Sequence, residues 1–292
     1  MNSFKEMPVD LNKNKLSEAL LKTSVGHATP EGWHLLHPIV ETHFHLDYLK
    51  QGTAEEIMSY NRSIGVTKAM TISVSASNIA EVLPLAMAHD NLFTTQGIHP
   101  HHAKEWNDEL ANIIKKNSPH PKVVAIGEVG LDYFYNHSPV DVQQQVFRRQ
   151  LELSIELDLP VIIHSREADA DTIAILSEFM PNLKRKGVIH SFTSGIPLLE
   201  FALKNDFYIG FNGIITFKSA DNVRLGLTHT PIEKILLETD APFLTPMPFR
   251  GKENAPFYLP FVAESMALHK KISPSTLLSQ IYNNSHALFH KL

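Results

Sequence analysis

Residues 39–47 read Ile-Val-Glu-Thr-His-Phe-His-Leu-Asp, an apolar run that ends in two histidines, His43 and His45, and an aspartate. On an extended strand, side chains two positions apart point to the same face, with about 6.5–7 Å between their backbone positions. Both imidazoles can therefore converge on one divalent ion. The His-x-His pattern on its own is a weak signal, so the rest of the chain has to support it.

Similar apolar runs recur along the chain and alternate with segments of helical character. The runs lie at 39–45, 69–74, 93–99, 123–129, 160–164, 187–190, 207–212 and 234–240. Segment 140–157 has the clearest helical periodicity, with apolar residues three, four or seven positions apart. This alternation predicts an α/β fold, a (β/α)8 TIM barrel, with a doubly wound open sheet as the alternative. The Gly-rich turn that marks dinucleotide-binding sheets does not follow the first run.

The first 37 residues differ from the rest in pattern. We expect an N-terminal extension over 1–37 that is ordered in part at most, with one short helix near 16–21, followed by a single barrel domain over 38–292. The first residues lack the apolar core of a secretory signal, and no stretch approaches 18 uninterrupted apolar residues. We therefore expect a cytoplasmic protein that does not associate with membranes.

Composition excludes several classes of protein. The 292 residues are 43% hydrophobic, which is enough for a sizeable core, and the formal net charge is −5. This charge argues against a broad basic face that coats duplex nucleic acid. The chain contains no cysteine, which excludes disulfide frameworks, cysteine-ligated zinc, iron–sulfur clusters and thiol nucleophiles. Histidine is abundant, with 17 residues, and its positions decide its meaning.

Polar residues gather where the predicted strands end. These residues are His43, His45, His99, His101, Glu128, His164, Arg166, His190 and Asp240. In a (β/α)8 barrel the carboxyl ends of all strands open onto the same rim, where active sites of this fold are built. A mixed set of imidazoles and carboxylates suits zinc, manganese, iron(II) or magnesium better than a cysteine-rich structural site does.

Each ligand candidate also has an ordinary structural explanation. A single histidine is more often a satisfied or surface residue, and Glu128 or Asp240 alone is more often a helix cap or a salt-bridge partner. Burying the whole set at strand ends, however, leaves polar groups that need partners, and metal ions satisfy them together. Glu128 can bridge two ions, His164 and His190 can supply nitrogen, and Asp240 can also accept a proton from water.

His99, His101 and Arg166 each have two alternative roles. The two histidines share a face around Pro100 and either contact a substrate phosphate or donate hydrogen bonds behind the ligands. Arg166 lies two positions after His164 and either clamps a phosphate or carboxylate or forms an internal salt bridge.

These motifs resemble the TatD family of metal-dependent deoxyribonucleases, among the amidohydrolase-like barrels. The resemblance covers residues 38–292 and rests on Thr-His-Phe-His-Leu-Asp at 42–47, Gly-Ile-His-Pro-His at 97–101, Gly-Glu-Val-Gly-Leu-Asp-Tyr at 127–133, Pro-Val-Ile-Ile-His-Ser-Arg at 160–166, Gly-Val-Ile-His-Ser-Phe at 187–192, Leu-Glu-Thr-Asp-Ala-Pro at 237–242 and Phe-Arg-Gly-Lys-Glu-Asn at 249–254. Three features depart from the family pattern: Glu41 in place of Asp, Ala241 in place of Ser, and the N-terminal extension.

The resemblance implies a set of roles. It implies two divalent ions (zinc, magnesium or manganese), one held by His43, His45 and Asp240 and the other by His164 and His190, with Glu128 between them. It also implies a phosphodiester substrate, usually DNA, and exonuclease action from a 3′ end or on a single strand.

The resulting hypothesis is hydrolysis assisted by two metal ions. Asp240 would orient the nucleophilic water, and Arg166 with His99 or His101 would assist at the phosphate. DNA is the expected partner, and the sequence indicates no obligate protein partner. Two alternatives remain: a C–N or ester hydrolase for a cyclic amide, lactone or aminoacyl ester, and a metal-binding scaffold without activity.

Overall fold

The computed structural model of the chain describes residues 13–30 and 32–292. The described helices are α1 Lys13–Leu20, α2 Ala54–Ser63, α3 Val82–Met87, α4 Asp108–Asn117, α5 Val140–Leu157, α6 Asp169–Phe179, α7 Ile196–Lys204, α8 Asp221–His229, α9 Leu259–Lys270 and α10 Pro274–Leu288. The strands are β1 Gly26–Thr29, β2 Gly32–Leu35, β3 Ile39–Phe44, β4 Val66–Thr71, β5 Leu92–Gln96, β6 Val123–Asp132, β7 Val161–Arg166, β8 Gly187–Ile189, β9 Tyr208–Phe211 and β10 Ile235–Leu237. In this part of the chain, none of the helices combines the length and the apolar character that crossing a membrane requires.

Strands β3 to β10 correspond to the eight apolar runs predicted from the sequence, and helical segments separate them along the chain. This order confirms the (β/α)8 fold class. Helix α5 has the boundaries that its periodicity predicts. By backbone contacts the described residues divide into two compact units, 13–30 and 32–70 with 211–285, and 71–210 with 286–292.

In the first unit, the carboxyl ends of β3 and β10 are joined. The β-branched residues Ile39 and Val40 of β3 are fully buried, as is Leu236 of β10. The Asp240 amide donates to the carbonyl oxygen of His43 over 2.9 Å, and the His45 amide donates to that of Ala241 over 2.7 Å. Side chains that leave the ends of these two strands are therefore neighbours.

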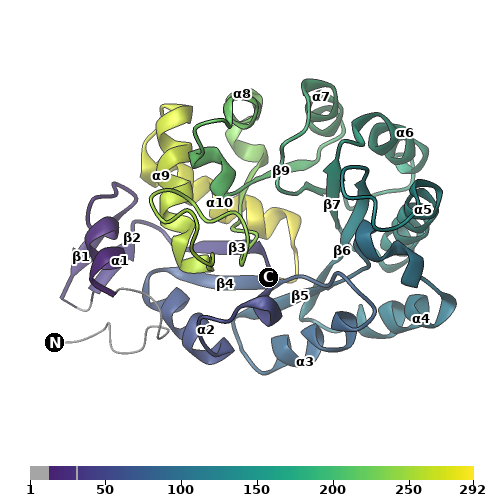
Figure 1. The fold of residues 1–292 in the computed structure, drawn as a ribbon, viewed down its shortest axis with the longest axis horizontal. Helices are drawn as coiled ribbons and strands as arrows, with labels where there is room; N and C mark the ends of the chain where they lie inside the picture. The colour runs from purple at the N-terminus through teal and green to yellow at the C-terminus, as the bar shows by residue number, and fades with distance from the viewer. Residues whose placement is uncertain (1–12, 31) are drawn as a thin grey trace. The chain divides into compact units, whose positions relative to one another are not determined.

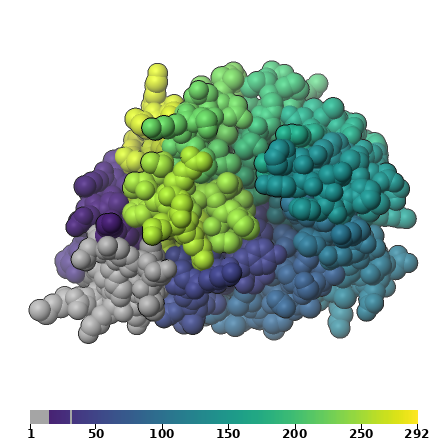
Figure 2. Space-filling model, viewed as in Figure 1, coloured from purple at the N-terminus to yellow at the C-terminus, as the bar shows by residue number. Residues whose placement is uncertain are grey.

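The loop that follows β10 in this unit is tied to the segment after β3. The Lys50 amide donates to Glu253 over 2.8 Å, and the Gln51 side-chain amide donates to the carbonyl oxygen of Asn254 over 2.9 Å. Figure 2 shows this loop on the face in view, next to the residues near position 50. These bonds hold the loop beside the end of β3.

The described part of the N-terminal segment packs within the first unit. Leu16 and Leu20 lie four positions apart on α1 and are both fully buried, as expected for one apolar helix face. The turn after α1 is fixed to α9, because the amide of Ser24 donates to Glu264 over 2.8 Å. Helix α1 lies beside the antiparallel pair β1–β2 (Figure 1).

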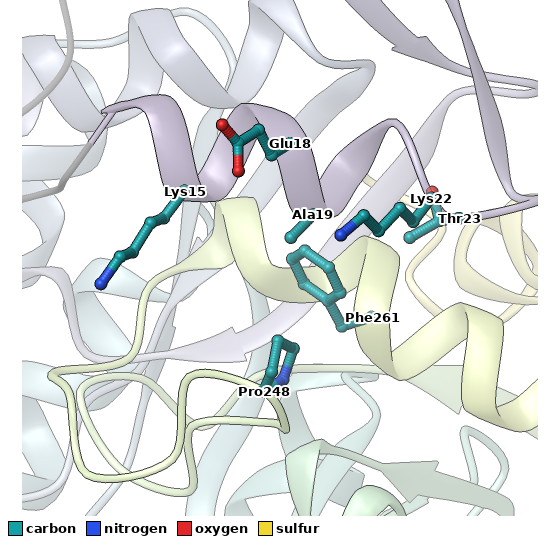
Figure 3. Close-up of a pocket in the computed structure, with 7 residues that line it drawn as sticks. All are labelled: Lys15, Glu18, Ala19, Lys22, Thr23, Pro248 and Phe261. Carbon is teal, nitrogen blue, oxygen red and sulfur yellow. The ribbon is translucent and has the colours of Figure 1, made fainter.

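A surface hollow of about 310 Å³ remains between α1, α9 and the loop after β10. Phe261 and Pro248 form its floor below Ala19, and Lys15 and Lys22 lie at its edge (Figure 3). The expected short helix near 16–21 is thus present as α1. The division into an extension over 1–37 and a domain over 38–292 stays a prediction, and residues 1–12 and 31 lie outside the described residues.

In the second unit, β5, β6, β7, β8 and β9 are parallel neighbours in chain order, without the reversal of a doubly wound sheet. Every residue of β6 is buried. Gly130, at φ +130°, lets β6 approach β7, since a Cβ there would overlap the carbonyl oxygen of His164. Helices α5, α6 and α7 lie side by side (Figure 1).

Candidate metal centres

The first unit gathers His43, His45 and Asp240, which we call the β3–β10 cluster. His43 belongs to β3, His45 follows that strand, and Asp240 follows β10. The Nε2 atoms of His43 and His45 lie 3.8 and 3.5 Å from Oδ1 of Asp240. Both histidines are buried, whereas the Asp240 side chain is 15% exposed. The carboxylate is therefore the most accessible member of this cluster.

A buried carboxyl group, Glu41, braces the β3–β10 cluster from behind. Its Oε1 accepts hydrogen bonds from the His43 amide over 2.9 Å and the Thr239 amide over 3.0 Å, and its Oε2 accepts one from the Thr239 hydroxyl over 2.6 Å. Burial raises the pKa of Glu41 to about 8, although these hydrogen bonds act in the opposite direction. Glu41 thus connects the backbone of one histidine to the residue that precedes Asp240.

The second unit gathers Glu128, His164 and His190, which we call the β6–β8 cluster. Each comes from a different strand or strand end: β6, β7 and the residue after β8. Oε1 of Glu128 lies 3.1 Å from Nδ1 of His164 and 3.4 Å from Nε2 of His190. Glu128 and His190 are buried and His164 is half-buried. Together with His99, whose Nε2 lies 3.5 Å from the same oxygen, three imidazoles thus converge on one carboxylate oxygen.

Asp132, at the end of β6, completes the surroundings of His164. Its Oδ2 lies 3.0 Å from Nε2 of His164 and 2.9 Å from Nε2 of His101, and its Oδ1 accepts the amides of Phe134 and Tyr135 over 3.0 and 2.9 Å. Burial alone raises the pKa of Asp132, but these hydrogen bonds outweigh burial and hold the pKa well below its usual range. Asp132 is therefore an ionised acceptor at the centre of this network.

Asp132 lies within the motif at 127–133, but the sequence pattern predicts no role for it. The available signal was its spacing, since residues four apart on a strand point to the same face and Asp132 follows Glu128 by four. His164 confirms this shared orientation, because its two ring nitrogens reach one carboxylate each. Burial lowers the pKa of His164, but the hydrogen bonds with Asp132 and Glu128 outweigh burial, so the pKa is raised.

His99 and His101 lie next to the β6–β8 cluster, around the start of the 3-10 helix η3 at Pro100–Glu105. The Nε2 atom of His99 is 3.5 Å from Oε1 of Glu128, and its Nδ1 accepts the His101 amide over 3.1 Å. Burial lowers the pKa of His99 well below its usual value, so the ring is neutral and carries its proton on Nε2. A protonated Nε2 favours hydrogen-bond donation over metal ligation.

Arg166 stacks on two aromatic rings. Its guanidinium carbon lies 4.3 Å from the ring centre of Phe134 and 4.7 Å from that of Tyr135. Within residues 13–30 and 32–292, its guanidinium makes no hydrogen bond or ion pair, so the internal salt bridge considered from the sequence is not formed there. Its N–H groups remain available to an anion.

The nitrogen–oxygen separations in both clusters are compatible with divalent ions, and in the second unit the ligand atoms of His99, Glu128 and His164 all lie within 4.8 Å of one another. Two ligands that each lie about 2.1 Å from one ion are about 3.0–3.5 Å apart at octahedral or tetrahedral angles. The nitrogen–oxygen separations of 3.1–3.8 Å in the two clusters are close to this range. The ligand roles of these residues and the bridging role of Glu128 stay predictions. The structure shows that the nitrogen and oxygen atoms of each cluster lie close together within its unit.

Known proteins similar in sequence to this chain belong to one family. The family model described as "TatD related DNase" matches residues 40–290. An "Uncharacterized metal-dependent hydrolase YabD" from Bacillus subtilis is 36% identical, and the match covers 86% of this chain and 98% of that protein. A "3'-5' ssDNA/RNA exonuclease TatD" from Erwinia tasmaniensis is also 36% identical, with 81% and 93% covered.

Solved structures give the same result for the fold. The crystal structure of YjjV, a TatD homologue from Escherichia coli, superposes with a TM-score of 0.81 at 30% identity and covers 86% of this chain and 98% of its own. A TatD family protein from Entamoeba histolytica superposes with a TM-score of 0.73 at 22% identity, which supports the fold alone.

Proposed function

This chain belongs to the family of TatD-related DNases and is a metal-dependent hydrolase that acts on ester bonds, and we propose that it hydrolyses DNA phosphodiester bonds from a 3′ end or on single strands. The exonuclease name of the Erwinia relative supports this substrate. The observation that carries the proposal is the convergence of imidazole nitrogens on a carboxylate oxygen in each unit.

The two clusters are proposed to hold one divalent ion each. His43, His45 and Asp240 would hold the first, and Glu128, His164 and His190 the second. A divalent ion lowers the pKa of a bound water and stabilises charge on phosphoryl oxygens. Imidazole and carboxylate ligands suit zinc or manganese and also accept magnesium.

The remaining roles belong to residues near these ligands. Asp240, the most exposed member of its cluster, would orient the attacking water and receive its proton. Arg166 would bind a phosphate oxygen through its N–H groups, which form a planar fork and make no hydrogen bond to any residue that the structure describes. His99 would donate a hydrogen bond from its Nε2 atom, because its Nδ1 atom already accepts a hydrogen bond from the His101 amide.

The experiment is digestion of a single-stranded oligonucleotide labelled at its 5′ end. We expect a ladder that shortens one nucleotide at a time, that stops when a chelator is added, and that resumes when zinc, manganese or magnesium is restored. Glu128→Ala and His164→Ala should abolish this turnover with the fold intact by circular dichroism, since each removes a ligand. His27→Ala, an exposed histidine in β1, serves as the matched control.

Two outcomes would overturn the proposal. The first is unchanged metal-dependent turnover in either cluster variant. The second is a wild-type protein that leaves the oligonucleotide intact but hydrolyses cyclic amides, lactones or aminoacyl esters in a parallel panel, which would assign the same site to the alternative bond class.

A further inference from the structure

A group of exposed aromatic rings follows β6 in the second unit. Phe134 is 51% exposed and Tyr135 is 49% exposed, although each is large and apolar enough to favour burial. The two rings meet edge to face with centres 4.8 Å apart, and His137 stacks parallel to Tyr135 with centres 5.8 Å apart. We call Phe134, Tyr135 and His137 the aromatic platform. Contiguous exposed rings of this kind are typical of surfaces that bind a ligand or a partner.

Arg166 turns the platform into a mixed cationic and aromatic surface. Its guanidinium lies over both Phe134 and Tyr135, which holds the charge at the protein surface without neutralising it. Because this side chain has no ion-pair partner in the part of the chain that the structure describes, its charge is available to a ligand. A ligand that suits the surface therefore combines a flat ring with a nearby negative charge.

The platform is joined to the β6–β8 cluster by one carboxylate. Asp132 accepts the backbone amides of Phe134 and Tyr135 through Oδ1, and through Oδ2 it contacts His164, a member of that cluster. His101 reinforces the connection, since its ring contacts both Tyr135 and His137 while its Nε2 binds Asp132. The aromatic rings are thus held in a fixed place beside the candidate metal ligands.

Nucleotides have the chemistry that this surface requires. A nucleobase offers a flat face for stacking on an aromatic ring, and its phosphate offers oxygens for a guanidinium. Base faces are free for stacking on protein only where the base is unpaired, so such a platform selects single strands or frayed ends over duplex. A cyclic amide or lactone offers neither the aromatic face nor the phosphate.

We propose that the aromatic platform and Arg166 form a subsite for an unpaired nucleotide, with its base stacked on the exposed Phe134 ring, on the face opposite Arg166, and its phosphate held by Arg166. This inference rests on the proposed function, and the subsite would explain why the enzyme prefers single-stranded substrates. Its ligand is the nucleotide next to the bond that is cut, because Asp132 ties the platform to His164.

The test is the double variant Phe134→Leu with Tyr135→Leu, which keeps apolar bulk but removes both ring faces. On a single-stranded oligonucleotide with an intact 3′-terminal base, we expect KM to rise about 5- to 100-fold, the effect of losing base stacking. On the same oligonucleotide with a 3′-terminal abasic residue, the wild type should already have the raised KM, and the double variant should add no more than about 2-fold, because the stacking partner is gone.

The matched control is Phe93→Leu. Phe93, on β5, also has a cation over its ring, since Lys122 Nζ lies 4.7 Å from the ring centre, but it precedes the strand end that leads to His99. This variant should keep the wild-type KM on both substrates. A second readout is independent of turnover: in chelator, fluorescence anisotropy of a labelled oligonucleotide should show the same weakening for the double variant and none for Phe93→Leu.

The outcomes separate this inference from the proposed function. If the wild type digests the oligonucleotide while the double variant keeps both its KM and its discrimination against the abasic end, the subsite does not exist and the proposed function stands. If the wild type digests no oligonucleotide and binds none in chelator, the inference and the proposed function both fail. Weakened binding by the double variant in chelator supports the subsite even where turnover is absent.

Discussion

At the scale of single residues, Glu41 stabilises the backbone around the β3–β10 cluster through its hydrogen bonds. Three donors, the amides of His43 and Thr239 and the Thr239 hydroxyl, depend on its two oxygens. Leaving a buried donor without an acceptor costs about 1–3 kcal/mol per group. Glu41→Ala should therefore lower the free energy of unfolding by at least about 3 kcal/mol in urea denaturation with chelator present.

Glu41→Gln separates the loss of hydrogen bonds from other effects of the substitution. Its amide oxygen can still accept both backbone donors, so its loss of stability should be clearly smaller than that of Glu41→Ala. Glu233→Gln, an exposed carboxyl in the same unit, should leave stability within about 0.5 kcal/mol of the wild type. Equal destabilisation by the alanine and glutamine variants would contradict the bracing role.

The sequence predicted the positions of single residues best where their spacing along a strand determines the direction of their side chains. The positions of His43, His45 and Asp240 at strand ends anticipated their proximity in the first unit, because parallel strands end together. The network around Asp132 was not anticipated. It depends on imidazoles that arrive from other elements, and local spacing does not encode that contact.

At the scale of elements, Glu105 anchors η3, the turn that carries His101. Its Oε2 accepts the Ala76 amide over 2.9 Å and its Oε1 contacts Nδ1 of His102 over 2.7 Å. Burial raises the pKa of Glu105, but these hydrogen bonds outweigh burial and lower the pKa below the ordinary value of 4.5. A carboxyl with a depressed pKa stabilises the fold above its unfolded pKa, and this effect is lost as pH falls through the folded pKa.

Glu105→Gln should therefore show a stability deficit that depends on pH. Near neutral pH we expect the variant to be about 1 kcal/mol less stable than the wild type, the value of a typical hydrogen bond to a partly exposed group. The deficit should narrow as pH falls below 4.5. Urea denaturation across a pH series measures it, with Glu81→Gln, an exposed glutamate in the same unit, as control. A deficit that stays constant with pH would contradict the assignment.

Element boundaries were predictable where the apolar pattern is unbroken, as in α5. Strand β4 begins three residues earlier than its apolar run, at Val66, because Lys68 interrupts the pattern without ending the strand. Strand β6 continues past Gly130, a residue that normally suggests a break, because its missing side chain allows close contact with β7. The β1–β2 hairpin was not predicted, since its glycines indicated only an interruption of helical pattern.

At the scale of the whole molecule, each compact unit contains its own candidate cluster, so metal binding should stabilise both. A ligand that binds only the folded state raises the free energy of unfolding by RT ln(1 + [L]/Kd), about 2.7 kcal/mol at a hundredfold excess over Kd. We therefore expect zinc or manganese to raise the melting temperature of chelator-treated protein. Elemental analysis of the reloaded wild type should find two ions per chain.

Variants in the two clusters decide whether these ions are independent. His45→Ala and His190→Ala should each reduce the bound metal to about one ion per chain and remove part of the thermal stabilisation, because each deletes one nitrogen ligand from a different unit. His27→Ala should keep both ions. A wild type with a single ion that is lost in only one of the two cluster variants would mean that the other cluster is held by its hydrogen bonds alone. The cluster that binds the ion would then be the one whose variant abolishes the metal-induced rise in melting temperature, measured by calorimetry.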